Sequence, residues 1–235
     1  MKTIIKKMCC FICSFILLIG LVGCGKTSQS IDKKSNEKVE KTKKYNKELA
    51  SLFPFVEGTV LRYSGTLEHM HTLTLNKVID GDVLKLNFKG QIEDLSEGET
   101  KKDLTIEEEY IIDKDSVKQV KSWQSIINEQ VVLKLPIKKG NVWKQKVIIK
   151  GKEYEAETKI VDISKDEKNK NMVKTETIVK GIKNYPQNTY KEIKVYKQDK
   201  GLVEFTNTIL LEGKENEKPT SMEFGYHLFE PEKSK

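Results

Sequence analysis

The chain has 235 residues, of which 42 are lysine or arginine and 35 are aspartate or glutamate, so its formal net charge is +7. The excess lies at the N-terminus. Residues 1–23 contain three lysines and no acid, residues 25–48 contain eight lysines and four acids, and residues 49–235 contain 31 of each kind. Arg62 is the single arginine, whereas arginine is the preferred side chain for binding phosphates and bases. The main body of the chain is therefore not expected to bind nucleic acid.

The first residues have the pattern of a secretory signal. Three lysines precede an apolar run from Met8 to Gly23, which is shorter than the roughly 20 residues that span a membrane. The run ends in Leu-Val-Gly followed by Cys24, which resembles the lipobox of bacterial lipoproteins. We expect residues 1–23 to be removed and Cys24 to accept a diacylglyceryl group that holds the chain on the outer face of the cell membrane. An uncleaved signal anchor is the alternative.

Cysteine usage agrees with this interpretation. The four cysteines are Cys9, Cys10, Cys13 and Cys24. Three lie in the predicted signal and the fourth is the predicted lipidation site, so the mature domain has no disulfide, no thiolate nucleophile and no cysteine metal site. Its core alone is expected to stabilise it.

The remaining chain divides into a tether and one domain. Residues 24–48 begin with the lipidated cysteine and are rich in Lys, Ser, Thr, Asn and Glu, a composition that cannot form a core. We interpret them as a flexible, solvated tether; contact of the lysines with anionic lipid or wall polymer is the alternative. Residues 49–235 are long enough for one extracytoplasmic domain. A short helix is expected near Lys43–Leu52, leading into the domain.

Alternating apolar and polar residues from Gly58 onward predict strands. Leu84, Leu86 and Phe88 alternate with polar residues, and similar runs recur toward the C-terminus, separated by short turn sequences with Gly, Asp or Asn. One apolar and one polar face are typical of antiparallel sheets. We predict a mainly β fold: a curved antiparallel sheet, a two-layer sandwich or a half-barrel, with at most one short helix packed on it, at Ser122–Glu129.

Four segments of the domain form a set of motifs. They are Phe53–Thr59 with Tyr63-Ser64-Gly65, Tyr110–Val117, Leu133–Trp143, and Gly201-Leu202-Val203. The set resembles a group of Gram-positive lipoproteins and secreted domains of unknown function, with the patterns "FPL..G..W.Y.G", "LKLP...G..W" and "G.GLV". Leu61 stands where that group has tryptophan, and Tyr185–Tyr190 stands where it has "TPAGTF". The resemblance implies an extracytoplasmic β-domain, often tethered, and carries no established catalytic residues.

His69 and His71 are the first candidates for a site. In a continuous strand both would project from the face that carries Leu73, and two imidazoles at that spacing could supply two ligands of zinc or copper. No third ligand is evident, because His227 has the opposite parity to Tyr226. The alternative is a hairpin tip at residues 68–70 with both histidines in water, and we predict neither a metal nor a cofactor.

Glu108 interrupts the apolar face formed by Ile106 and Tyr110. A buried carboxylate there would have a raised pKa and could act as an acid or base; a bulge, a strand end or an open mouth of the sheet is the alternative. Asn207 interrupts a later apolar face in the same way, and a satisfied hydrogen bond is the default for such a residue.

No sequence pattern supports an enzyme, since the chain has neither a Gly-x-Ser-x-Gly elbow nor a phosphate-binding glycine loop. We expect no catalytic residues. We interpret the chain as a membrane-anchored lipoprotein that acts as a non-enzymatic binding or structural module of the cell envelope. Its concave sheet would hold an unidentified envelope ligand or protein. The alternative is a metal-handling protein or enzyme that uses His69, His71 and Glu108.

Overall fold

The computed structural model describes residues 45–66, 70–93, 103–122, 126–211 and 219–230. In these ranges the protein is mainly β, with one sheet of 12 strands and antiparallel pairing between all neighbours. The helical elements are α1 (Lys47–Ala50) and the 3₁₀ turn η1 (Pro186–Asn188). The strands are β1 (Val60–Gly65), β2 (His71–Asp80), β3 (Leu84–Ile92), β4 (Thr105–Ile112), β5 (Ser116–Lys121), β6 (Glu129–Lys134), β7 (Val142–Ile149), β8 (Lys152–Lys165), β9 (Asn171–Lys180), β10 (Thr189–Lys197), β11 (Gly201–Leu211) and β12 (Thr220–Leu228).

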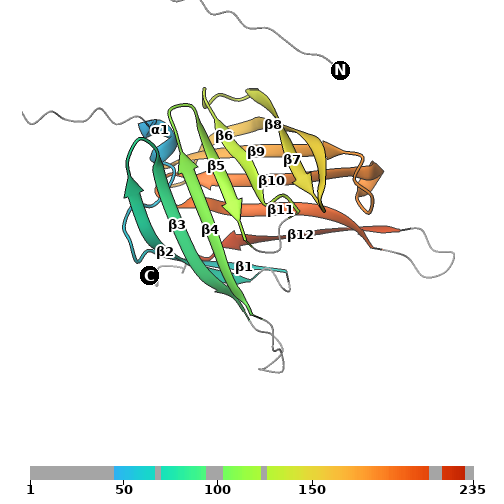
Figure 1. Ribbon diagram of the computed structural model, residues 1–235, viewed down its shortest axis with the longest axis horizontal. Coiled ribbons are helices and arrows are strands. Elements are labelled where there is room, and N and C mark those ends of the chain that lie inside the picture. The colour runs from blue at the N-terminus through green and yellow to red at the C-terminus, as the bar shows by residue number, and fades with distance from the viewer. Residues whose placement is uncertain (1–44, 67–69, 94–102, 123–125, 212–218, 231–235) are drawn as a thin grey trace, which may run out of the picture. The chain divides into compact units, whose positions relative to one another are not determined.

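The sheet curls until its two edge strands approach each other. The strand order is β6-β5-β4-β3-β2-β1-β12-β11-β10-β9-β8-β7. Each strand therefore pairs with the next one in sequence, except that β6 does not pair with β7 and that β1 pairs with β12. In Figure 1 the green strands β2–β5 lie in front of the orange strands β8–β11. The predicted curved antiparallel sheet is confirmed, in a nearly closed, barrel-like form.

Glycines permit the strong curvature of the sheet. A Cβ atom on Gly90 of β3 would lie 1.7 Å from the carbonyl oxygen of Thr72 on β2, and one on Gly225 of β12 would lie 2.0 Å from that of Phe205 on β11. No side chain can be accommodated at such distances, so only glycine allows the neighbouring backbones to approach this closely.

One end of the curled sheet is closed by α1 and the residues that follow it. Asn46 caps the helix, because its Oδ1 accepts a hydrogen bond from the Leu49 N–H at 2.9 Å. Phe53 is fully buried, with its ring centroid 4.7 Å from that of Tyr110 and 5.9 Å from that of Tyr196. The folded part of the chain thus includes the short helix, which begins two residues before the domain boundary expected from composition.

Side chains fill the inner face of the sheet in the described part of the chain. One apolar cluster combines α1 with inner residues of all 12 strands, and a second combines inner residues of β7–β10 with the segments before β6 and before β10. Apolar side chains therefore occupy much of the concave face in the described part of the chain.

The helix expected at Ser122–Glu129 is wrong where the structure describes it. Residues 126–128 are not helical, and Glu129 already belongs to β6; residues 123–125, which include Trp123, lie outside the described residues. The physical reason is strand pairing. The carbonyl oxygen of Asn128 accepts the N–H of Lys121 at 2.8 Å, which continues the β5–β6 ladder and keeps this segment extended. Ile127 is buried in the second apolar cluster.

Candidate functional site

A layer of polar side chains is buried inside the sheet, and its first half lies on β4 and β5. Glu108 and Lys121 are register partners on these strands. The Lys121 Nζ lies 3.6 Å from Oε2 of Glu108 and donates to the Tyr226 hydroxyl at 3.0 Å. The Gln119 Nε2 donates to Glu108 Oε1 at 2.6 Å and to the Tyr110 hydroxyl at 2.8 Å. The carboxylate is thereby paired and hydrogen-bonded, as a buried charge requires.

The second half of the buried layer is centred on Glu192 of β10. Its Oε1 accepts hydrogen bonds from Lys194 Nζ at 2.7 Å and from Gln130 Nε2 at 2.7 Å, while its Oε2 accepts one from the Tyr190 hydroxyl at 2.6 Å. The two buried lysines and two buried glutamates balance each other in charge. Both ammonium groups also lie near the ring of Phe205, at 5.9 Å for Lys121 and 6.0 Å for Lys194.

The environment of Glu108 corrects the expectation of a raised pKa. Burial alone would raise the pKa of its carboxyl. The Lys121 ammonium and the hydrogen bonds from Tyr110 and Gln119 outweigh burial, so the pKa of Glu108 lies below its usual value. The sequence placed this carboxylate on the inner face correctly, but it could not supply the cation opposite. Glu108 is therefore ionised and paired near neutral pH.

The two lysines respond differently to burial. The pKa of Lys194 is lowered, because burial outweighs the attraction of Glu192 and Lys121 adds repulsion. The pKa of Lys121 is raised, because burial is outweighed by Glu108 and by the interactions with Tyr226. The side chains of the Lys121–Glu108 pair are only 6% and 2% exposed. The charged groups of this layer are thus shielded from a ligand in the outer solvent.

His71 is buried, which corrects the alternative of two water-exposed histidines. Its ring stacks on Tyr63 with 4.5 Å between centroids and contacts the Tyr226 ring edge-on at 4.8 Å. It is close enough to Glu108 to lower the pKa of that carboxyl. His69 lies outside the described residues. Within the ranges that the structure describes, no three His, Cys, Asp or Glu side chains are grouped to hold a metal ion.

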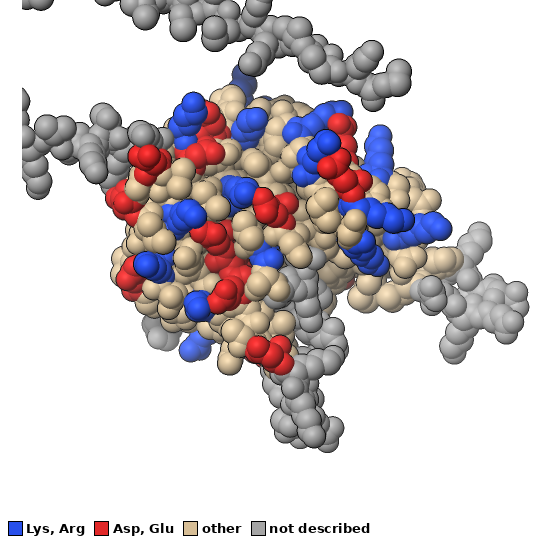
Figure 2. Space-filling view, in the orientation of Figure 1, with Lys and Arg blue, Asp and Glu red and all other residues tan. Residues whose placement is uncertain are grey.

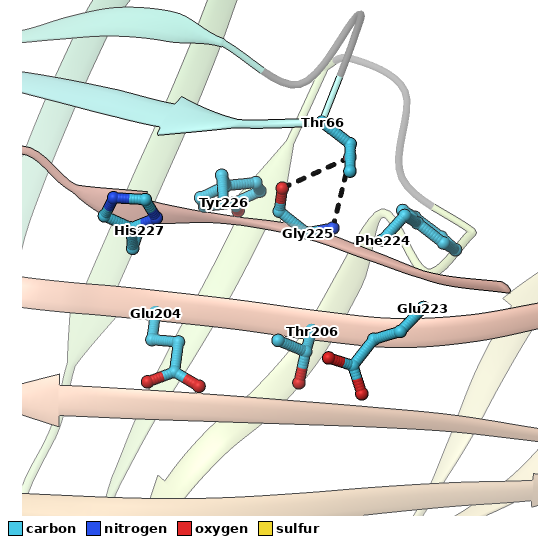
Figure 3. A pocket seen from close by; sticks show the side chains of 8 residues that line it. All are labelled: Thr66, Glu204, Thr206, Glu223, Phe224, Gly225, Tyr226 and His227. Atoms are coloured by element: carbon cyan, nitrogen blue, oxygen red, sulfur yellow. Dashed lines mark hydrogen bonds between the residues drawn. The ribbon is translucent and has the colours of Figure 1, made fainter.

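A shallow pocket of about 350 Å³ lies on the outer face of β11 and β12. Figure 3 shows Glu204 and Thr206 of β11 beside Glu223 of β12, with His227 farther along β12. The hydroxyl of Thr66 bonds to both the N–H and the carbonyl of Gly225, each at 3.3 Å. His227 is exposed on the face opposite to Tyr226, as its parity predicted. The pocket holds carboxylates without a buried polar group directed into it.

The gap between the unpaired edges of β6 and β7, which we call the seam, is closed by side chains in its first half. The Oε1 of Gln145 accepts the N–H of Val131 at 2.7 Å, and its Nε2 donates to the Val131 carbonyl at 2.9 Å. The indole N–H of Trp143 donates to the same carbonyl at 3.1 Å. Trp143 is buried in the apolar cluster that contains Leu133, as the sequence predicted.

The second half of the seam is a cleft of about 880 Å³, which we call the seam cleft. It is lined by Lys118, Ile126, Asn128, Glu129, Gln130, Val131, Gln145, Lys146, Val147, Ile148, Lys150 and Gly151. Gln130 and Val147 are buried, whereas Lys146 and Ile148 are exposed. Because neighbouring residues of a strand point to opposite faces, the lining of the cleft includes residues of both faces of the sheet.

Gln130 links the seam cleft to the buried layer. The Nε2 of Gln130 donates to the Glu192 carboxylate, which identifies the other end of the carboxamide as the oxygen Oε1. That oxygen is buried and has no hydrogen-bond partner among the described residues. Leaving a buried acceptor unpaired costs about 1–3 kcal/mol.

Charge distribution separates the seam cleft from the rest of the surface. On the face formed by β3–β5, Figure 2 shows acidic and basic side chains interspersed, and Lys89 and Glu107 form an exposed pair at 2.8 Å. The seam cleft instead combines three lysines with the single acid Glu129. The lining residues alone therefore favour an anionic ligand, with Lys118 paired to Glu129 and Lys146 paired to Glu153 outside the lining.

Comparison with known proteins gives no independent assignment. No family model, no curated protein and no solved structure matches the chain. Within the described ranges, no helix combines the length and apolar character needed to cross a membrane. The candidate site therefore depends on the residues of this chain alone.

Sequence reasoning missed most of the buried polar layer, although a signal for it existed. The turn at Asp113–Asp115 fixes the β4–β5 register, which places Lys121 opposite Glu108. Glu192 and Lys194 are two residues apart and share a face with buried Tyr190. A search for charged residues that interrupt an apolar strand face singled out Glu108, and the same search would have found Glu192 and Lys194. Nothing local to the chain indicated that Gln130 would meet Glu192.

Proposed function

We propose that the protein is a lipid-anchored lipoprotein that serves as a non-enzymatic binding module of the cell envelope, with the seam cleft as its binding site. The cleft of about 880 Å³ between the two sheet edges carries the assignment of the site, and its lining includes Gln130, whose buried Oε1 has no partner among the described residues. Ligand sites in proteins commonly measure roughly 300–1,000 Å³ and contain a few polar groups that fix the ligand's orientation.

The anchor is proposed at Cys24, on the strength of the lipobox-like sequence and the preceding apolar run. Two acyl chains hold a protein on a bilayer stably, at about 0.8 kcal/mol per buried CH₂ group. Wild-type protein should therefore fractionate with membranes, and mass spectrometry should find a diacylglyceryl group on an N-terminal Cys24. Cys24→Ala should remain unprocessed or be released. An unmodified Cys24 in the mature wild type would contradict the anchor.

The binding site is tested with two matched substitutions on β7. Ile148 lines the seam cleft and is 57% exposed, whereas Val142 is 45% exposed on the same strand but lies outside the cleft. In a deletion strain, Ile148→Trp should fill the cleft and fail to restore the wild-type envelope phenotype. Val142→Trp should restore it. Membrane abundance and thermal unfolding of both variants must match wild type, and full complementation by Ile148→Trp would disprove the assignment.

One observation favours a second candidate function, an enzyme or metal-handling protein that uses His69, His71 and Glu108. The structure brings His71 and Glu108 into the same buried layer, together with Lys121. Convergent ionisable groups are typical of catalytic sites. The matched experiment is the double variant Glu108→Gln with Lys121→Met in the same deletion strain, because removing both charges avoids an unpaired buried ion. If it abolishes complementation at unchanged stability while Ile148→Trp restores the phenotype, the second candidate replaces the first.

A further inference from the structure

The geometry of the seam points to its occupant. We propose that the seam cleft binds an extended, acidic peptide segment of a partner protein, which adds to the sheet as a strand between β6 and β7. The inference rests on the proposed function, because it assigns an occupant to the same cleft. Three features of the seam support it: the side-chain amide that stands in for a strand in its closed half, its unpaired backbone groups and its charge.

The closed half of the seam is bridged by the side chain of Gln145. The Gln145 carboxamide both accepts from and donates to the peptide groups of Val131. It thereby occupies the position that the peptide unit of a neighbouring strand would take beside β6. The side-chain amide thus takes the place of a neighbouring strand in the closed half of the seam.

The open half offers backbone hydrogen-bonding groups on both sides. Lys150 and Gly151 form a two-residue turn, so the flanking residues Ile149 and Lys152 form a hydrogen-bonded pair. Because such pairs alternate along an antiparallel ladder, Lys146 and Ile148 direct their N–H and C=O groups away from β8 and toward the seam. On β6, Glu129 shares the seam-facing parity of Val131.

Both edges therefore present the groups that a peptide strand pairs with. Strands β6 and β7 run in opposite directions, because 11 antiparallel steps separate them in the strand order. An added strand would be antiparallel to one edge and parallel to the other, as occurs in mixed sheets.

The charge of the cleft selects an acidic peptide. Lys118 is paired with Glu129 at 2.5 Å, and Lys146 is paired with Glu153 at 2.8 Å, with both side chains of the latter pair more than half exposed. Exposed pairs of this kind are weak and exchange partners readily. Lys150 also lines the cleft and adds a third cation. Carboxylates on the outward side of an inserted strand would meet these ammonium groups.

The test uses full-length protein in detergent micelles and three capped, fluorescein-labelled eight-residue peptides. The first alternates valine with glutamate, the second alternates valine with lysine, and the third is the glutamate peptide with every second amide N-methylated. By fluorescence anisotropy, the glutamate peptide should bind at least about tenfold more tightly than either of the others. Equal binding of all three would overturn the proposal.

Variants on β7 locate the binding. Lys146→Glu should weaken binding of the glutamate peptide at least about fivefold, whereas Lys144→Glu, on the same strand outside the cleft, should not. Ile148→Pro removes a seam-facing N–H without breaking the β7–β8 ladder, and it should abolish binding. Val142→Pro, at the first residue of β7, is its control. Thermal unfolding of each variant shows whether it has folded.

Failure of this inference can be told apart from failure of the proposed function. If the glutamate peptide shows no saturable binding up to about 1 mM, the peptide proposal is overturned. If Ile148→Trp nevertheless fails to complement the deletion strain, the cleft is a binding site for a ligand of different chemistry. If Ile148→Trp complements fully and the peptide does not bind, both proposals are wrong.

Discussion

Removing the cation from the buried Glu108–Lys121 pair should be among the most destabilising single changes on the inner face. In Lys121→Met the Glu108 carboxylate keeps its hydrogen bonds from Gln119 and Tyr110 but loses an ammonium 3.6 Å away. At an effective dielectric constant of about 20, two charges at that distance attract by about 5 kcal/mol. Breaking a buried pair from one side typically costs about 3–5 kcal/mol, in line with this value.

The loss of stability in Lys121→Met should depend on pH, and the pKa of Glu108 fixes the direction. In wild type the pKa of Glu108 lies below its usual value, so the ionised carboxylate stabilises the fold above the unfolded-state pKa of about 4.3 and loses that effect as the pH falls through the folded-state pKa. In Lys121→Met, we expect burial, no longer opposed by the ammonium group, to raise the pKa of Glu108. The variant's deficit relative to wild type should be largest at pH 7–8 and shrink as the pH falls toward about 5.

Urea unfolding of wild type, Lys121→Met, Glu108→Gln and the double variant measures this coupling. The double variant carries no buried charge at this position and should regain most of the stability that Lys121→Met loses. Lys89→Met is the matched control, because Lys89 pairs with Glu107 on the outer face with both side chains 57% exposed. It should change stability little. A deficit below about 1 kcal/mol for Lys121→Met, or a deficit that grows on acidification, would refute the reasoning.

Two further predictions follow from the core. Trp143→Ala should cost about 3–5 kcal/mol, because it leaves a cavity beside Leu133 and removes a hydrogen bond to Val131. Urea unfolding measures the loss, and a fluorescence maximum of Trp143 that does not move on unfolding, in a Trp123→Phe background, would contradict its burial. His71→Ala should cost about 2–4 kcal/mol, because its ring packs against two tyrosines. Unfolding at the wild-type urea midpoint would show that this packing contributes nothing.

The sequence by itself determined the class of fold and the face on which most residues lie. Alternation fixes whether a side chain points inward, because successive residues of a strand project to opposite faces. Leu84, Leu86 and Phe88 are accordingly buried, and Glu108 lies on the inner face as its neighbours predicted. The short helix before the domain was also predictable from local residues. All of these properties are set by residues that lie within a few positions of one another in the sequence.

Only the tertiary structure decided what each inward residue meets. His71 is buried because Tyr63 and Tyr226 arrive from β1 and β12, and no local pattern states which strands become neighbours. Glu192 pairs with Gln130 across 62 residues of chain. The low pKa of Glu108 likewise depends on the cation opposite it.

The seam is the clearest case of a feature that no segment of the chain contains. Strands β6 and β7 follow each other in sequence, with seven residues between them. They stay apart because the curvature accumulated over 12 twisted strands sets the distance between the two edges of the sheet. The closing bonds from Gln145 and Trp143 to Val131 form only at that distance. The candidate binding site exists because the sheet as a whole stops short of closing.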